Sequence, residues 1–193
     1  MRVSEGNDEL ERLLGETRRL YARLREAARA EWNRDLPLDE LLFDRWQRAQ
    51  ELGFGEGTSI YHSSYVYGDV RVGRGTWIGP FTILDGTGGL VIGDRCSISS
   101  GVHIYTHDTV KWAVSGGASP YEHAPVEIGN CCYVGPNAVV AKGVAIGEHS
   151  VVGAASFVNH DVPPYSIAVG APCRTVGSVR VDGAEVAFEY ERA

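Results

Sequence analysis

The sequence predicts a mainly β protein, a parallel β-helix of six-residue repeats preceded by a helical segment. Aliphatic residues recur every six positions from Ile60 onward, with two breaks, and a small or β-branched residue follows most of them four positions later. Glycine accounts for 24 of 193 residues, about 12% where ~7% is usual. Neither a collagen period nor a low-complexity run explains that excess, so a fold with many tight backbone turns is expected.

The N-terminal segment, residues 1–53, is predicted to be helical. Residues 8–52 are rich in Leu, Arg, Glu and Ala and almost free of glycine. Residues 33–37 interrupt this segment, and residues 38–52 predict a second, shorter helix. We therefore expect a helical hairpin packed on the main body. The apolar stripe of the first helix consists of Leu10, Leu13, Leu14, Leu20, Leu24 and Ala28.

Residues 54–177 carry the six-residue repeat. The aliphatic positions are Ile60, Val66, Val72, Ile78, Leu84, Ile92, Ile98, Ile104, Ile128, Val134, Val140, Ile146, Val152 and Val158. The small positions are Ser64, Val70, Thr76, Thr82, Cys96, Val102, Cys132, Ala138, Val144, Ser150, Ser156 and Val162. A period of six fits neither an α-helix nor a simple hairpin meander, but it fits a parallel β-helix. Three repeats close a triangular coil with the aliphatic residue inside, and glycine or asparagine is expected to adopt the backbone angles of the corners.

The repeat slips by two residues through DGTGG, residues 85–89, is interrupted later by a long excursion, and ends in a patterned tail. Residues 108–125 lose the repeat and predict a protruding loop, in which Gly116 and Gly117 allow bending. Loops on a rigid scaffold commonly carry binding residues. The tail, residues 178–193, alternates apolar and polar residues around Asp182-Gly183, which predicts a hairpin that pairs with a neighbour or covers a coil end.

Several segments resemble a known family. PVEIGNCCYVGPNAVV, VAIGEHSVVGAASFV and DVPPYSIAVGAPCRTVG are similar to the hexapeptide-repeat acyltransferases, whose fold is a left-handed parallel β-helix. Within that family the chain looks closest to the maltose, galactoside and nodulation-factor acetyltransferases and to sugar O-acetyltransferases of polysaccharide biosynthesis. The resemblance covers roughly residues 55–180. It implies acetyl-CoA as the acyl donor and a homotrimer with active sites between subunits.

Acyl transfer to a hydroxyl requires a base, and histidine is the usual choice because its pKa lies near neutrality. Of the six histidines, His107 stands where the family's catalytic histidine is expected, at the root of the loop that leaves the coil. The resemblance also matches Asp85 to a carboxylate that helps to bind the acceptor. Trp112 and Tyr121, inside the loop, are candidates for stacking on a substrate.

The resemblance assigns coenzyme-binding positions to the C-terminal coils. The matching residues are Pro136, Ala154, Asn159, His160 and Arg174. Arg174 suits a coenzyme phosphate because its guanidinium forms a planar fork. Lys142, one of only two lysines, is an additional candidate for a phosphate contact.

Composition excludes several function classes. The formal net charge is -7, which disfavours nucleic-acid and anionic-membrane binding. No run of about 18 apolar residues predicts a membrane span, and the polar N-terminus is unlike a signal peptide. The four cysteines lack zinc-finger spacing, so a cytoplasmic protein without disulfides or metal is expected.

The predicted function is transfer of an acetyl group from acetyl-CoA to a sugar or saccharide hydroxyl, with His107 as general base in a ternary complex. Transfer to the amine of an amino sugar or another small molecule is an alternative, because one histidine serves either acceptor. A non-catalytic β-helix scaffold is a second alternative. A γ-class carbonic-anhydrase-like metal enzyme is the third, although no two histidines lie five residues apart as that site requires.

Overall fold

The computed structural model describes the backbone of residues 3–190 and the side chains of residues 8–190. The chain divides into two compact units, Met1–Asp44 and Arg45–Ala193. Within the described residues, no helix has both the length and the apolar content needed to cross a membrane.

The first unit is a long helix with a short helix folded back against its end. Helix α1 spans Val3–Trp32 and α2 spans Leu38–Leu42. Asp35 in the connection accepts hydrogen bonds from Arg25 and from Arg29, and these ion pairs hold the turn against α1. The second helix predicted over residues 38–52 is broken, because the backbone is extended at Phe43. Its C-terminal part is a separate helix, α3 (Arg45–Glu51), in the second unit.

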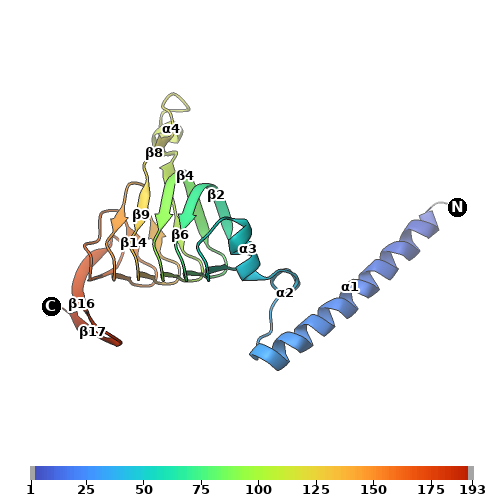
Figure 1. The fold of residues 1–193 in the computed structure, drawn as a ribbon. Helices are drawn as coiled ribbons and strands as arrows, with labels where there is room; N and C mark the ends of the chain where they lie inside the picture. The colour runs from blue at the N-terminus through green and yellow to red at the C-terminus, as the bar shows by residue number, and fades with distance from the viewer. Residues whose placement is uncertain (1–2, 191–193) are drawn as a thin grey trace. The chain divides into compact units, whose positions relative to one another are not determined.

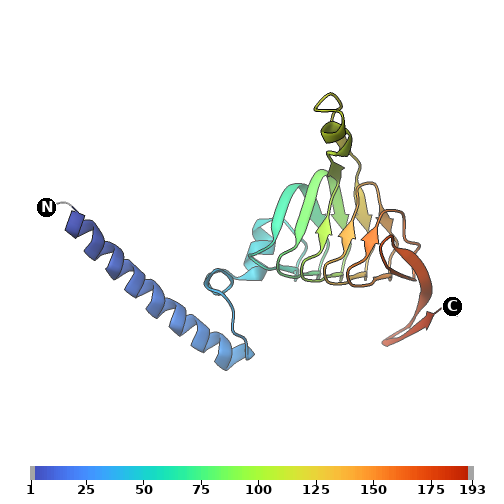
Figure 2. The same cartoon turned by 180° about the vertical axis from the view of Figure 1, so that it is seen from behind.

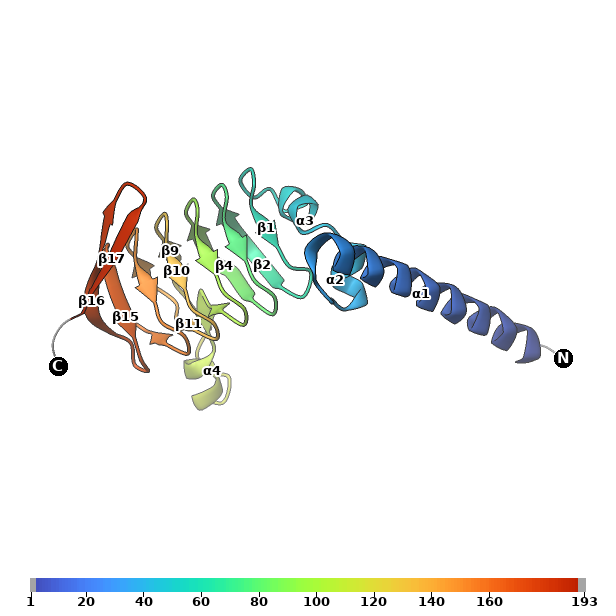
Figure 3. The ribbon, with the colours of Figure 1, turned by 90° about the horizontal axis from the view of Figure 1, so that it is seen from below.

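The second unit is the parallel β-helix that the repeat predicts, with its coils stacked one on another (Figures 1 and 3). One ladder has the strand order β1-β3-β5-β10-β13-β15 and is parallel throughout. Its strands are β1 (Ser59–Ile60), β3 (Trp77–Ile78), β5 (Ser97–Ile98), β10 (Tyr133–Val134), β13 (Val151–Val152) and β15 (Ser166–Val169). The other two sides are built by β2 (Tyr65–Val72), β4 (Ile83–Ile92), β6 (His103–Ile104), β9 (Val126–Ile128), β11 (Val139–Val140), β12 (Ala145–Ile146) and β14 (Phe157–Val158).

The core lies inside the coils, as predicted. Thirteen of the fourteen aliphatic repeat positions are buried, and Val66 is half-buried and packs against them. Eleven of the twelve small positions are also buried, including Cys96 and Cys132. Register pairs each aliphatic residue with its equivalent in the next coil, as in Ile98 with Val134. Removal of this apolar surface from water stabilises the fold by roughly 25 cal/mol per Å².

The glycine after each aliphatic residue has a different role from the one predicted. Gly135 and its equivalents do not have positive φ; that conformation falls two residues later, and most often on a residue with a side chain. The positive-φ residues are Gly75, Phe81, Arg95, Cys131, Asn137, His149 and Ala155. Gly135 is required by close approach instead, because a Cβ there would lie 2.6 Å from the backbone nitrogen of Ala154 in the next coil.

Both ends of the β-helix are covered by the chain itself. At the first coil, Ala49 and Phe54 join the core, and the Arg48 guanidinium donates to the carbonyls of Tyr61 and Ser64. At the last coil, β16 (Arg174–Asp182) pairs antiparallel with β15 and then with β17 (Glu185–Tyr190). The hairpin predicted around Asp182-Gly183 is therefore present and pairs with its own chain; residues 191–193 of the predicted tail lie outside the described residues.

The predicted loop leaves the stack at one corner and projects away from it (Figures 1 and 2). Its two sides pair as β7 (His107–Asp108) and β8 (Glu122–His123), and α4 (Val110–Val114) lies beyond them.

We predict that Gly135→Ala destabilises the β-helix by about 1–3 kcal/mol, because the added Cβ must displace the backbone of the next coil. Asn137→Gly is the matched control two residues away. Asn137 already has φ of 58°, a conformation that glycine adopts without strain, so this change should cost much less. Urea unfolding of both variants checks the prediction, and equal losses of stability would contradict it.

Candidate active site

His107 lies where the regular coil ends and the loop begins. It follows β6, and its side chain remains 32% exposed at the rim of the β-helix. The ring packs against His123 from the returning strand, with a centroid separation of 5.8 Å. The two histidines, one from each strand of the loop root, therefore lie next to each other.

Asp85 reaches His107 because the neighbouring coil is longer than the repeat requires. Strand β4 runs through Asp85-Gly86-Thr87-Gly88-Gly89, and its pairing with β2 shifts register there. The segment lies tightly against the coil that carries His107: a Cβ on Gly88 would overlap the Thr106 carbonyl oxygen. The glycines of this segment thus allow a carboxylate to be placed beneath the loop root.

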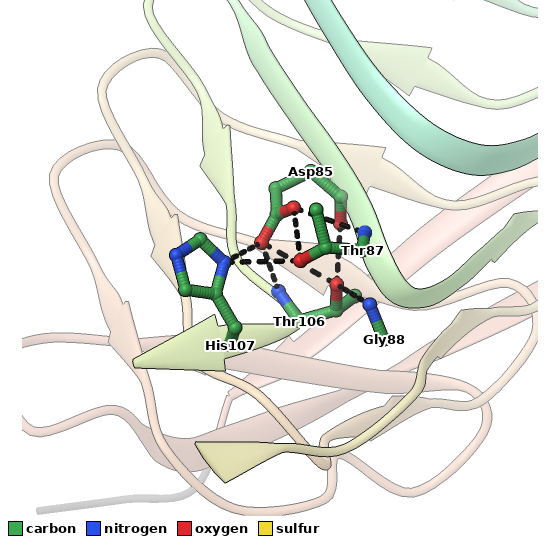
Figure 4. Close-up of polar contacts among 5 residues, drawn as sticks. All are labelled: Asp85, Thr87, Gly88, Thr106 and His107. Carbon is green, nitrogen blue, oxygen red and sulfur yellow. Dashed lines mark hydrogen bonds and ion pairs between the residues drawn. The ribbon is translucent and has the colours of Figure 1, made fainter. Parts of the chain in front are cut away.

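The Asp85 carboxylate is buried and fully engaged by hydrogen bonds (Figure 4). Its Oδ2 lies 2.6 Å from His107 Nδ1 and accepts the Thr106 N–H at 2.9 Å. Its Oδ1 accepts the Thr87 N–H at 3.0 Å and the Thr87 hydroxyl at 2.7 Å. The carboxylate expected to contact an acceptor therefore faces the histidine, behind the exposed side of the ring.

The charge of Asp85 fixes the tautomer of His107. Burial raises the pKa of Asp85, but the hydrogen bonds from Thr87, Thr106 and His107 lower it, and the resulting pKa is about 2. An ionised carboxylate only accepts hydrogen bonds, so Nδ1 must carry the proton. In the neutral imidazole, Nε2 then holds the lone pair, on the side of the ring away from Asp85 (Figure 4). Among residues 8–190, whose side chains the structure describes, no hydrogen bond to Nε2 is found. A neutral imidazole with a free Nε2 can accept a proton.

Thr87 and Thr106 support this pair, although no motif in the sequence marks them. Thr106 is buried, donates its hydroxyl to the Asp85 carbonyl at 2.8 Å and accepts the Gly88 N–H at 2.8 Å. Thr87 Oγ1 is also 3.1 Å from His107 Nδ1. Only their positions in the sequence could have identified them: Thr106 immediately precedes His107, and Thr87 lies two residues after Asp85.

The residues predicted to bind coenzyme fall into separate groups. Pro136 and Ala154 lie at one corner of successive coils, where the Ala155 N–H donates to the Pro136 carbonyl. Asn159 and His160 follow β14 at the corner that also carries the loop, because β6, β11 and β14 are aligned in register. Arg174 begins β16 and donates to the Cys173 carbonyl.

Two other predicted candidates lie in or beside the loop. Trp112 on α4 is exposed and packs edge-on against Tyr121, with a centroid separation of 5.5 Å. Lys142 does not stand free for a phosphate: its Nζ is 2.7 Å from Asp108 and 3.5 Å from Glu122.

Among the residues that the structure describes, no three His, Cys, Asp or Glu side chains are grouped so that they could hold a metal ion. The cysteines are free thiols, and Cys96, Cys132 and Cys173 are buried.

Comparison with known proteins shows which class of proteins shares this repeat and fold. Residues 125–160 match the family described as bacterial transferase hexapeptide (six repeats). The chain is 33% identical over 100 residues to galactoside O-acetyltransferase of Escherichia coli, a match that covers 47% of this chain and 48% of the relative. It is 28% identical over 138 residues to chloramphenicol acetyltransferase of Morganella morganii, covering 62% and 65%. The chain thus spans about half the length of the first of these relatives.

Solved structures show the same fold at lower identity. AntD, an N-acyltransferase from Bacillus cereus solved with dTDP and 3-hydroxybutyryl-CoA, has a TM-score of 0.57 at 20% identity, covering 70% of this chain and 90% of AntD. The acetyltransferase domain of PglB from Neisseria gonorrhoeae, solved with acetyl coenzyme A, has a TM-score of 0.52 at 16% identity, covering 64% and 50%. With its repeat, core and coil register, the chain has the fold of these hexapeptide-repeat transferases, and residues 125–160 match the repeat of that family.

The low pKa of Asp85 predicts a pH-dependent contribution to stability. Because the folded-state pKa of about 2 lies below the ordinary value, the ionised carboxylate stabilises the fold above about pH 4. This contribution, about 2 kcal/mol, is lost as the pH falls toward 2. We expect the stability difference between wild type and Asp85→Asn, measured by urea unfolding, to shrink between pH 5 and pH 2. Glu127→Gln, on an exposed carboxylate, is the control; a difference independent of pH would contradict the prediction.

Proposed function

We propose that this protein transfers an acetyl group from acetyl-CoA to a hydroxyl of a sugar or saccharide, with His107 as general base. The observation that carries the proposal is the His107–Asp85 pair at the root of a protruding loop on a hexapeptide-repeat β-helix. The named activities of the relatives support acetyl transfer, and galactoside O-acetyltransferase supports a sugar hydroxyl as acceptor.

In this proposal His107 first accepts a proton from the acceptor and then donates it to the leaving group. Nε2 removes the proton of the acceptor hydroxyl as its oxygen attacks the acetyl carbonyl carbon, which gives a tetrahedral oxyanion. Collapse of that intermediate breaks the carbon–sulfur bond, and the departing coenzyme A sulfur takes the proton from Nε2. The products are the acetyl ester and free coenzyme A. A positioned base of this kind contributes typically ~10²- to 10⁴-fold in rate, and orientation of the two substrates adds to it.

Asp85 acts through His107 rather than on the acceptor. Its carboxylate accepts the Nδ1 proton, which leaves Nε2 unprotonated before reaction and stabilises the imidazolium formed during it. Thr87 and Thr106 keep the carboxylate ionised and fixed. The charge that develops on His107 is therefore balanced by a buried, preorganised anion.

The residues expected to bind acetyl-CoA fit a coenzyme that extends along the edge of the coils. Asn159 and His160 stand two coils beyond His107 at the same corner, about 10 Å away at the usual strand spacing. An extended pantetheine arm running along this corner would bring its thioester to Nε2. Pro136, Ala154 and Arg174 would contact the rest of the coenzyme, and Trp112 the acceptor. We further propose a homotrimer with each site at a subunit boundary, which sedimentation analysis checks.

We predict that His107→Ala lowers turnover by at least ~10²-fold while coenzyme A binding is unchanged, because the base is removed but not the donor groove. Release of free thiol, measured over a panel of sugar and amino-sugar acceptors, identifies the acceptor class, and calorimetry measures binding. His149→Ala, at a different corner and stacked on Tyr165, is the control. Full activity of His107→Ala would refute the assignment; absence of coenzyme binding in wild type would favour the scaffold alternative.

We predict that Asp85→Asn also lowers kcat by ~10²- to 10⁴-fold, because an amide can donate to Nδ1 and so favour the wrong tautomer. The double variant Asp85→Asn/His107→Ala should be little worse than His107→Ala alone, since Asp85 acts only through the histidine. A steady-state comparison of the three variants checks this, and additive losses would show that Asp85 has an independent role on the acceptor.

A further inference from the structure

The root of the loop places two carboxylates opposite each other. Asp108 on β7 pairs in register with Glu122 on β8, so both side chains lie across the same two-residue ladder. Like charges at directly opposite positions destabilise a strand pair. This short ladder needs a cation, because it has only two residue pairs with which to hold the loop.

Lys142 supplies that cation from the next coil. It lies at the corner between β11 and β12, and its Nζ contacts Asp108 at 2.7 Å and Glu122 at 3.5 Å. Its side chain is 25% exposed. The hydrogen bond to Lys142 lowers the pKa of Asp108, and the same bond raises the pKa of Lys142, so both groups are charged at neutral pH.

The second lysine of the chain forms an ion pair with one of these two carboxylates. Lys111 on α4 forms an ion pair with Glu122 at 2.6 Å, and its side chain is 66% exposed. It belongs to the loop itself and cannot tie the loop to the coils. Lys142 is anchored in the β-helix and touches both strands of the root.

We propose that Lys142 is a positioning residue that closes the root of the loop and thereby holds His107 against Asp85. Asp108 is the residue after His107, and His123, which packs on the His107 ring, is the residue after Glu122. The bridge from Lys142 to both carboxylates therefore fixes the backbone on both sides of the two histidines. The contribution to turnover rests on the proposed function, whereas the structural part does not.

Removal of this bridge should be visible without any substrate. In Lys142→Met, which keeps the length of the side chain but not its charge, we expect hydrogen exchange of the amides of residues 107–109 and 121–124 to accelerate at least ~10-fold, while the core strands stay protected. Lys111→Met is the matched control, with little change, and Lys142→Arg should restore protection. Unchanged exchange in Lys142→Met would overturn the proposal.

Kinetic readouts separate positioning from coenzyme binding. We expect Lys142→Met to lower kcat ~10-fold or more with the Kd for coenzyme A within about twofold of wild type, and Asp108→Asn/Lys142→Met to recover part of the loss because it removes the unpaired charge. A weakened Kd with unchanged exchange would overturn the proposal and make Lys142 a phosphate ligand. If wild type shows no transfer but Lys142→Met accelerates exchange, the proposed function fails and the anchoring role stands.

Discussion

Stacking of the coils in register is the constraint on which the rest of the structure depends. Neighbouring coils are separated by one strand spacing, about 4.8 Å, so every inward position must be filled and every extra residue must go outward. The buried ladder through Leu84, Ile104 and Val140 continues past both interruptions of the repeat. The extension at Asp85 therefore stays packed against the neighbouring coil, whereas the loop after Thr106 leaves the coils and remains attached at its root.

The same stacking creates the candidate site. Asp85, His107 and Lys142 come from three successive coils at one corner, and each can be positioned because the strand before it is fixed by its neighbours. Burial of a lone carboxylate would be costly. Here two threonines and a histidine surround it, so its charge is retained next to the imidazole. The rigid scaffold thus provides a fixed anion next to the histidine that the proposed mechanism uses as its base.

The loop shows how an interruption can be held without a core of its own. Between residues 108 and 125, all of which the structure describes, no apolar side chain is buried, and helix α4 is short and exposed. The root of the loop depends on a short strand pair, a stacked histidine pair and the ion pairs to Lys142. Such a segment opens more easily than the coils.

The fold could be predicted from the sequence alone, because a six-residue period in aliphatic and small side chains is compatible with few other ways of burying them. The sequence also pointed to His107, by its place at the break of the repeat, and to the loop and the final hairpin. The tertiary structure decided the rest. Which glycines are required by close approach depends on the next coil, as at Gly135 and Ala154. The break at Phe43, the turn of Asp85 toward His107, and the bridging of Asp108 and Glu122 by Lys142 depend on contacts between residues distant in sequence. No local pattern encodes such contacts, since they arise only when the coils are stacked.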